Sequence, residues 1–479
     1  KKLEKQVIIK NILKSKRMKK IYLVILVLSF ISIKVKAQSV EDTLRDQLTE
    51  VKDRINGIDE RLMTSESSLS KLTKIKISGY VQSQFDYFEN KAVQPNNYFS
   101  LRRVRLKATY EAADGIKFVV QPDFSPNGFS LKDAYVVLND HFIKNGLFKN
   151  AISLTAGKFN RLNYEVEYSS SQREVPERSL VIRSIYPGER AIGFKFEVSP
   201  QNIPVKLQLG MFNGNDGGFN QFSDTTGKFA NTVVENKDVD NFKDFMARAT
   251  YSFKLGNFGG LDLGAHTYFG SLKSNTNATL HSDYSTIDSS KVGDAIKRNW
   301  FGAEFQLFAD ILGGMSLKAE YITGKNVMLG GNKFANGSLL PNFQNNFAGY
   351  YVYLIKNIGS KNQFAFRYDY YDPNTDITGS DVKVVKYNGD ASKKIGKLSS
   401  SKVDLAYTTL TFAWHYYFDD NIRISLAYAI VQNEKVAKNA SGVGNLTESY
   451  TNPDGTTGVN DYSDVFKQNQ LTLRLQAKF

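Results

Sequence analysis

Residues 470–479 read Gln-Leu-Thr-Leu-Arg-Leu-Gln-Ala-Lys-Phe, and this stretch indicates the fold class. Side chains of a β-strand point alternately to its two faces, so the apolar residues at 471, 473, 475, 477 and 479 share one face. In a soluble protein the polar face would meet water and the apolar face a core. In an outer-membrane barrel the apolar face meets lipid, and a closing strand that ends on an aromatic residue is typical. The rest of the chain decides between these two interpretations.

The alternation recurs from Ile75 to the end of the chain. It is clear in residues 205–211 (Val-Lys-Leu-Gln-Leu-Gly-Met) and in residues 409–418 (Thr-Leu-Thr-Phe-Ala-Trp-His-Tyr-Tyr-Phe). Sixteen candidate strands are centred near residues 81, 105, 119, 136, 154, 194, 208, 248, 265, 304, 318, 352, 367, 412, 426 and 474. Their connections alternate between short and long. Short ones include 112–115, 199–202, 311–314 and 419–420, and long ones cover roughly 159–189, 214–242, 272–298, 325–346, 372–404 and 433–466. This pattern predicts an all-β fold, a 16-stranded antiparallel transmembrane β-barrel over residues 75–479 with both ends on the periplasmic side.

The N-terminal segment predicts export. Met18-Lys19-Lys20 precedes the apolar run 21–31, and Val35-Lys36-Ala37 supplies small residues at the positions that a signal peptidase recognises. We therefore expect a signal peptide over residues 18–37, preceded by an upstream extension over residues 1–17. The apolar run is too short for a membrane-spanning helix.

Residues 40–74 show a different periodicity from the strands. Positions 44, 48, 51, 55, 58, 62, 65, 69 and 72 follow 4-3-4-3 spacing and are apolar except for Ser65. This heptad pattern predicts a short periplasmic α-helical coiled coil that joins copies of the chain. A single amphipathic helix at the barrel mouth is the alternative, and Gly57 would weaken either helix.

Composition excludes several classes of protein. The formal net charge is +14, but residues 1–37 contain eleven Lys or Arg and one Glu, so the remainder has 51 basic and 47 acidic residues. A net charge of about +4 gives nucleic-acid binding little support. The absence of cysteine excludes disulfides, cysteine metal sites and thiol catalysis. Abundant Tyr and Phe in a polar chain fit a lipid-facing barrel with aromatic girdles.

Several local stretches resemble a known family. They are residues 99–106 (Phe-Ser-Leu-Arg-Arg-Val-Arg-Leu), 121–124 (Gln-Pro-Asp-Phe), 131–135 (Leu-Lys-Asp-Ala-Tyr), 156–159 (Ala-Gly-Lys-Phe), 169–170, 176–178 (Pro-Glu-Arg) and 367–373 (Arg-Tyr-Asp-Tyr-Tyr-Asp-Pro). In this order they resemble the phosphate-selective porin O and P family, over roughly residues 75–479. The resemblance implies a trimeric, 16-stranded porin of the bacterial outer membrane with a basic constriction for anions.

A ladder of cations on the second strand is the first candidate site. If Val104, Leu106 and Ala108 face lipid, then Arg103, Arg105 and Lys107 face the lumen, because charge on the lipid face is costly. Such cations lower the barrier for anions, and guanidinium groups suit phosphate through paired hydrogen bonds. Pore-lining basic residues that only balance acidic ones are the plainer interpretation.

The connection over residues 159–189 is the candidate constriction loop. Its cations are Arg161, Arg173, Arg178 and Arg183, with Lys158 at the strand edge, and its acids are Glu165, Glu167, Glu174 and Glu177. Mixed charge can create a transverse field across a pore, or can form loop ion pairs of little consequence. Asp123 and Asp133 are proposed to orient the Arg103–Arg105 ladder. Other inward positions are mixed in charge, with Arg248, Arg367, Arg423 and Arg474 opposed by Asp262, Glu304, Glu320 and Asp369.

The sequence thus predicts a passive channel for small hydrophilic solutes, with a preference for anions and phosphate as the candidate solute. A non-selective porin is the first alternative. A barrel hydrolase is less supported, because His266 and His415 face the lumen but no Ser lies beside either in a recognisable motif. An adhesin is the third alternative, since the long loops are rich in Asn, Ser, Gly and Thr. We expect no enzyme activity, no metal and no cofactor. Expected partners are outer-membrane lipid, small anions and two further copies of the chain, not nucleic acid.

Overall fold

The computed structural model describes residues 14–26, 47–55, 57–64, 66, 74–125, 128–140, 143, 145–214, 219–223, 228–232, 238, 240–311, 313–330, 341–382, 402–465 and 468–479. By internal contacts the chain divides into two compact units, residues 1–74 and residues 75–479.

In the first unit, residues 14–26, 47–55, 57–64 and 66 are helical and Lys74 lies in a turn. The predicted signal peptide is helical up to residue 26, and its remainder lies outside the described residues. Along the predicted coiled coil, the apolar seam residues Leu48, Val51, Ile55, Ile58 and Leu62 are all more than half exposed. Seam positions 44, 65, 69 and 72 lie outside the described residues. Within the described chain, no helix is both long and apolar enough to cross a membrane.

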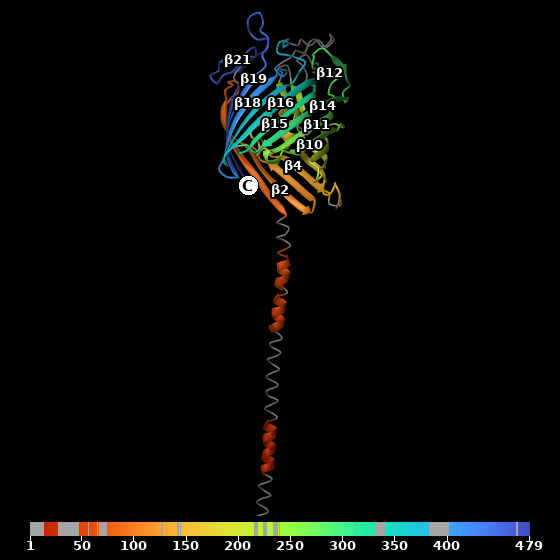
Figure 1. Ribbon diagram of the computed structural model, residues 1–479, viewed down its shortest axis with the longest axis vertical. Helices are drawn as coiled ribbons and strands as arrows, with labels where there is room; N and C mark the ends of the chain where they lie inside the picture. The colour runs from red at the N-terminus through yellow and green to blue at the C-terminus, as the bar shows by residue number, and fades with distance from the viewer. Residues whose placement is uncertain are drawn as a thin grey trace, which may run out of the picture. The chain divides into compact units, whose positions relative to one another are not determined.

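The second unit is a closed antiparallel barrel of sixteen strands, which confirms the predicted fold (Figure 1). Each of the predicted strand centres falls inside one observed strand. The barrel strands are β1 (Ile75–Phe88), β2 (Asn97–Ala113), β3 (Ile116–Asp123), β4 (Ser130–Asn139), β5 (Ile152–Asn160), β6 (Arg190–Val198), β7 (Val205–Phe212), β10 (Asp244–Lys254), β11 (Gly259–Lys273), β14 (Ala295–Ala309), β15 (Met315–Met328), β16 (Asn342–Ile358), β17 (Asn362–Asp372), β18 (Tyr407–Tyr417), β19 (Ile422–Asn433) and β22 (Gln470–Lys478).

The last strand closes the barrel against the first. β22 pairs with β1 in antiparallel register, with Lys478 opposite Tyr80 and Gln470 opposite Phe88. Phe479 continues the ladder, because its backbone N–H and C=O both pair with Gly79 at 3.0 Å. A Cβ atom on Gly79 would lie 2.7 Å from the Phe479 ring, so the ring occupies the space that a larger residue at position 79 would fill.

The distribution of burial is that of a membrane barrel. On β22, Leu473 and Leu475 are 45% and 49% exposed, whereas Thr472 and Arg474 are 3% and 2% exposed. The same inversion holds along much of the other strands, where many apolar side chains face outward and polar or charged ones are buried inside, apart from the apolar wall residues that contact the inner loop. An outward apolar face and a polar interior suit lipid outside and a polar lumen inside.

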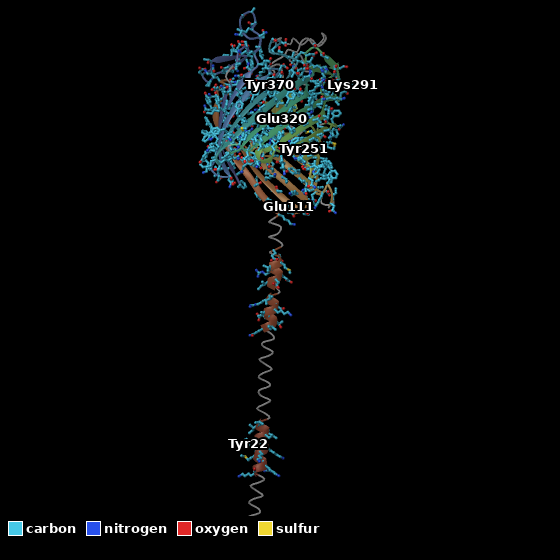
Figure 2. All side chains as sticks on the ribbon, in the orientation of Figure 1. Tyr22, Glu111, Tyr251, Lys291, Glu320 and Tyr370 are labelled. Carbon is cyan, nitrogen blue, oxygen red and sulfur yellow. The ribbon has the colours of Figure 1, made fainter. Side chains whose placement is uncertain are left out.

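Short and long connections separate the two ends of the barrel. Glu111 next to a short turn and Lys291 in a long connection lie at opposite ends (Figure 2). The long connections contain further short elements: β8 (Phe219–Ser223), β9 (Lys228–Thr232), β12 (Ala278–His281), β13 (Ile287–Ser289), β20 (Thr447–Thr451) and β21 (Thr457–Asp461). A 3-10 turn, η1 (Gly256–Phe258), lies at the short-turn end.

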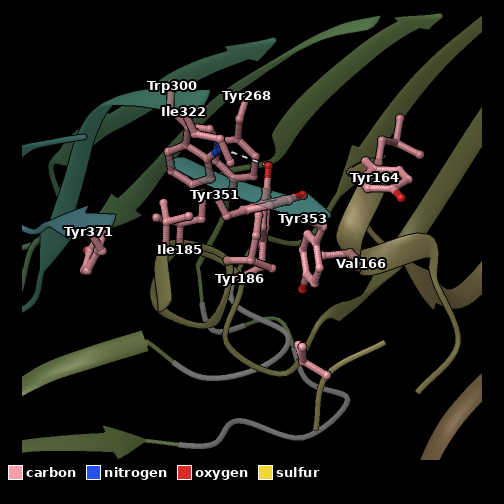
Figure 3. Close-up of a cluster of buried hydrophobic side chains, with 14 of the residues drawn as sticks. Tyr164, Val166, Ile185, Tyr186, Tyr268, Trp300, Ile322, Tyr351, Tyr353 and Tyr371 are labelled. Atoms are coloured by element: carbon pink, nitrogen blue, oxygen red, sulfur yellow. Dashed lines mark hydrogen bonds between the residues drawn. The ribbon is translucent and has the colours of Figure 1, made fainter. Parts of the chain in front are cut away.

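The connection between β5 and β6, residues 161–189, packs inside the barrel and contains two short helices, α2 (Tyr164–Glu167) and α3 (Leu180–Ile185). Leu162, Val166, Val181 and Ile182 of this loop are fully buried, in a cluster with wall residues such as Tyr268, Trp300, Ile322, Phe347 and Tyr351 (Figure 3). The Trp300 indole N–H donates a 2.9 Å hydrogen bond to the Tyr186 hydroxyl. Each fully buried apolar side chain contributes about 1.5–3 kcal/mol, so the cluster shared with the wall stabilises the position of the loop inside the barrel.

Candidate functional site

The loop over residues 161–189 is tied to the wall by polar contacts as well. Five of its backbone carbonyls accept hydrogen bonds from inward side chains of β1, β17, β18 and β22. These are Ser170 from Gln82 (3.1 Å), Ser171 from Gln476 (3.1 Å), Glu174 from His415 (2.6 Å), Pro176 from Arg474 (3.0 Å) and Glu177 from Arg367 (2.7 Å). The loop over residues 161–189 therefore narrows the lumen and is attached to the wall at four strands.

Glu177 in this loop is surrounded by four arginines. Arg102 donates two hydrogen bonds to its carboxylate, at 3.0 and 2.9 Å. Arg103, Arg173 and Arg474 bring guanidinium nitrogens to 3.6, 3.8 and 3.3 Å from the same group. One carboxylate thus joins cations from β2, from the loop and from β22.

A β-bulge explains how two consecutive arginines reach the same carboxylate. Gln82 lies opposite Arg103 and Ser83 lies opposite Leu101, so Arg102 is the extra, unpaired residue of β2. Strict alternation would send Arg102 toward lipid, but the bulge turns its side chain inward. Sequence reasoning missed Arg102 for this reason, although the Arg-Arg pair was the available signal.

Glu189 is the second acidic centre, at the end of the loop. Its carboxylate pairs with Arg173 at 3.0 Å, with Arg178, and with Arg190 at 2.7 Å. Arg190 also binds Asp133 at 3.0 Å. Neither Glu189 nor Arg190 was among the predicted site residues, although Glu189 is the last residue of the expected loop, because no local pattern in the sequence indicates its arginine partners.

The ladder arginine Arg105 is fixed by Asp123. Its Nε lies 2.8 Å from the Asp123 carboxylate, and its Nη1 donates to the hydroxyls of Tyr80 and Ser170, both at 3.0 Å. Asp133 was expected to orient the same ladder, but its described ion pair is with Arg190. Asp133 lies on β4, two strands from the ladder on β2, and it faces the lumen. At this position it is close to Arg190, the first residue of β6.

Together these contacts form one group, here called the arginine cluster: Arg102, Arg103, Arg105, Arg173, Arg178, Arg190 and Arg474 with Glu177, Glu189, Asp123 and Asp133. It holds seven guanidinium groups and four carboxylates. The formal surplus of three positive charges favours anions beside it.

Burial opposes ionisation of the two central glutamates, but the arginines outweigh it. The guanidinium groups of Arg103, Arg102 and Arg173 hold the pKa of Glu177 well below its usual range. The pKa of Glu189 is lowered in the same way, against its burial, by Arg173 and Arg190. Both groups are therefore ionised at neutral pH. Glu165 differs, because burial raises its pKa against the effect of Arg367.

A cavity of about 660 Å³ lies beside the cluster, toward the short-turn end of β1–β7. It is here called the inner cavity. Its charged lining residues are Arg105, Lys107, Arg190, Lys195, Lys206 and Lys478, opposed by Asp133, Glu167 and Glu197. Six basic groups against three acidic ones extend the positive character of the cluster into this cavity.

The remaining predicted cations have different surroundings. Lys107 lines the inner cavity, as inward alternation on β2 requires. Lys158 pairs across strands with Ala134, on the face opposite to the lumen-facing Asp133 and Tyr135, so it does not face the pore as expected. The prediction placed Lys158 at the edge of the loop and did not take into account the alternation of side chains between the two faces of β5.

The loop cations Arg161, Arg178 and Arg183 also separate in role. Arg161 donates to the carbonyl of Pro187 at 3.3 Å and so joins the two ends of the loop. Arg178 donates to the carbonyls of Glu165, Val166 and Tyr168 at 2.8–3.0 Å, which makes it largely an internal support of the loop. Arg183, by contrast, is exposed on α3.

The two lumen-facing histidines lie in buried polar contacts. His266 Nε2 is 2.7 Å from Glu320. His415 lies opposite Ser425 across the β18–β19 pair, with Nδ1 2.7 Å from the serine hydroxyl. This Ser–His contact was not visible in the sequence, because it joins neighbouring strands. Among the described residues, no group of three or more His, Asp or Glu is arranged to hold a metal ion.

Comparison with the solved OprB structure supports the fold. The chain is similar to OprB of Pseudomonas putida, with 10% identity over 87% of this chain and 96% of that one, and a TM-score of 0.50. An anion-selective porin of Comamonas acidovorans has 12% identity over 85% and 99%, and a TM-score of 0.45. The trimer form of OmpT, an outer membrane protein of Vibrio cholerae, has 10% identity over 85% and 99%, and a TM-score of 0.46. No curated protein sequence matches the chain significantly.

Comparison with protein families gives a more specific result. The phosphate-selective porin O and P family matches residues 75–328, which is just over half of the chain and includes the loop and most of the arginine cluster. The match agrees with the resemblance drawn from the short motifs. The chain therefore belongs to the phosphate-selective porin O and P family and is a β-barrel porin of the bacterial outer membrane.

Proposed function

We propose that this porin is a passive diffusion channel with a preference for anions, and that phosphate is its best candidate solute. The observation that carries the proposal is the arginine cluster at the loop, with seven guanidinium groups to four carboxylates. An anion beside it exchanges hydration water for guanidinium donors. Because the arginines are already shared with Glu177 and Glu189, such binding is weak enough to allow release.

The route inward from the cluster supports the same proposal. Arg105 and Arg190 belong to the cluster and also line the inner cavity, where Lys107, Lys195, Lys206 and Lys478 continue the basic surface. Arg102 presents a 39% exposed side chain at the cluster. Oxygen-rich anions suit these groups, since guanidinium binds phosphate through two parallel hydrogen bonds.

The test is the reversal potential of the purified protein in a planar bilayer under a KCl gradient, repeated with phosphate added. We expect anion selectivity and a chloride current that phosphate reduces. Stepwise conductance without ion preference would reduce the proposal to a non-selective porin. That alternative is favoured by the opposite wall, where Arg248 is neutralised by Glu167 and Glu304 at 2.7 and 2.6 Å.

Catalysis is the second candidate, raised by the contact between His415 and Ser425. Both side chains are at most 3% exposed, and neither lines the inner cavity. The other imidazole nitrogen of His415 is engaged by the Glu174 carbonyl, so no carboxylate orients the ring. We therefore propose a channel and not a hydrolase. Ester hydrolysis by the purified porin that is lost in Ser425→Ala would overturn this.

We also propose that the porin assembles as a homotrimer in contact with outer-membrane lipid, with residues 40–74 as its coiled coil. The exposed seam of Leu48, Val51, Ile55, Ile58 and Leu62 supports self-association, because isolated helices rarely leave such a stripe in water. Light scattering of the detergent-solubilised chain tests the number of copies. Val51→Asp with Ile58→Asp is expected to weaken the assembly.

A further inference from the structure

A second lumen cavity, of about 330 Å³, lies on the other side of the loop and is here called the outer cavity. One part of its lining is apolar, with Val175, Pro176 and Leu180 from the loop and Ala427, Ala429 and Val431 from β19. The adjoining part of the wall is polar and includes Arg367, Asp369, Thr409 and Thr411 on β17 and β18. Inorganic phosphate has no surface that would use the apolar part. The volume and the mixed lining suit a small organic molecule.

Three buried polar atoms on this lining lack partners. Arg367 Nε, Asp369 Oδ1 and Thr411 Oγ1 make no hydrogen bond with the described residues. Their side chains belong to residues that are 5%, 1% and 3% exposed. Arg367 and Thr411 lie directly opposite each other in the β17–β18 pair. Buried polar groups are nearly always paired, so an adjacent unpaired donor, acceptor and hydroxyl indicate a ligand that supplies both kinds of partner.

A cation completes the outer cavity from the loop side. Arg183 on α3 lines it and is exposed, and no hydrogen bond or ion pair joins its guanidinium group to the described residues. The arginines of the cluster, by contrast, are already held by carboxylates. Arg183 is therefore ready to bind a carboxylate without first losing a partner.

We propose that the outer cavity binds zwitterionic α-amino acids with a short aliphatic side chain. The carboxylate would pair with Arg183 and the Arg367 edge, the ammonium group with Asp369 and the Thr411 hydroxyl, and the side chain with Val175, Leu180 and Val431. This solute class is separate from the phosphate preference proposed above. The proposal relies on the channel only as the route by which the amino acid reaches the outer cavity.

Calorimetry of the purified full-length porin in detergent tests the proposal with three probes that share an isobutyl group. They are leucine, 3-methylbutylamine (which lacks the carboxylate) and 4-methylpentanoate (which lacks the ammonium group). Leucine is expected to bind at least tenfold more tightly than either analogue. Equal affinity for leucine and 4-methylpentanoate would refute the zwitterion assignment, and no binding of leucine would refute the site.

Two variants locate the binding to the outer cavity. Arg183→Gln is expected to weaken leucine binding at least tenfold, and Thr411→Val at least threefold. Thr411→Val removes a hydroxyl that has no partner among the described residues, so the fold should tolerate it. The matched control is Thr155→Val, which removes a buried hydroxyl that lines the inner cavity. Unchanged affinity in both cavity variants would overturn the proposal. Calorimetry needs no conductance, so a failure of the channel proposal is seen separately in the bilayer.

Discussion

Replacing Glu177 by Gln tests the electrostatics of the arginine cluster most directly. The change keeps the shape of the side chain and removes one negative charge that is shared by Arg102, Arg103, Arg173 and Arg474. The formal surplus of the cluster rises from three positive charges to four. We expect the porin to become more anion-selective.

The size of the effect follows from the repulsion between the Glu177 carboxylate and a permeating anion, which the variant removes. Two unit charges about 6 Å apart repel by about 0.7 kcal/mol at a dielectric constant of about 80 and about 3 kcal/mol at about 20. The lumen beside the loop is part water and part protein, so about 1–2 kcal/mol is the reasonable range. This corresponds to a roughly 5- to 30-fold rise in the ratio of chloride to potassium permeability.

The assay is the reversal potential under a KCl gradient for wild type and Glu177→Gln. Glu111→Gln is the matched control, because it removes the same formal charge near a short turn at one end of the barrel, where Glu111 pairs only weakly with Lys117 at 4.0 Å. Circular dichroism checks that both variants fold. Selectivity that stays constant in folded Glu177→Gln, or that rises equally in the control, would refute the reasoning.

Three further predictions concern the packing and titration of the lumen. Asp123→Asn leaves the buried Arg105 guanidinium without its carboxylate and should lower the free energy of urea unfolding by about 3–5 kcal/mol. A double variant that also carries Arg105→Gln should lose less stability than the sum of the two single variants. Trp300→Phe removes the donor to the Tyr186 hydroxyl and should cost about 1–3 kcal/mol and increase open-channel current noise. Variant traces as quiet as those of the wild type would contradict a role of this hydrogen bond in holding the loop. The folded protein holds the pKa values of Glu177 and Glu189 below the ordinary glutamate value. Their ion pairs therefore stabilise the folded state fully at pH values above the ordinary glutamate pKa, and this stabilisation is lost as the pH falls through the lowered pKa values. Anion selectivity should therefore be the same at pH 7 and pH 5, and reversal potentials that change over this interval would show that other groups control the constriction.

The strands could be predicted from sequence because their signal is local. A period of two with an apolar outward face identifies β22, and the alternation of turn lengths orders the barrel. The helices α2 and α3 were missed, since four and six residues are too short to show a helical period. Their buried side chains became recognisable only from the wall that they contact.

The candidate site was harder to predict, because its contacts join distant positions. Arg105 and Lys107 follow from alternation, but Arg102 depends on a bulge that one strand cannot reveal. Lys158 was assigned to the pore although its pairing with Ala134 places it on the outer face. The partners of Glu177 lie on β2 and β22, and no local pattern indicates which arginines meet one carboxylate.

The attachment of the loop also constrains the order in which the molecule is made. Ser171 and Glu177 are synthesised early, yet their partners Gln476 and Arg474 follow about 300 positions later, at separations of 305 and 297 residues. Contacts of such high sequence separation form late. Until β22 docks on β1, the carbonyls of Ser171 and Pro176 lack the Gln476 and Arg474 side chains that hold them in the finished barrel. The pairing of β22 with β1 thus closes the barrel and completes the attachment of the constriction loop in one step. A barrel that has not closed therefore lacks its complete constriction.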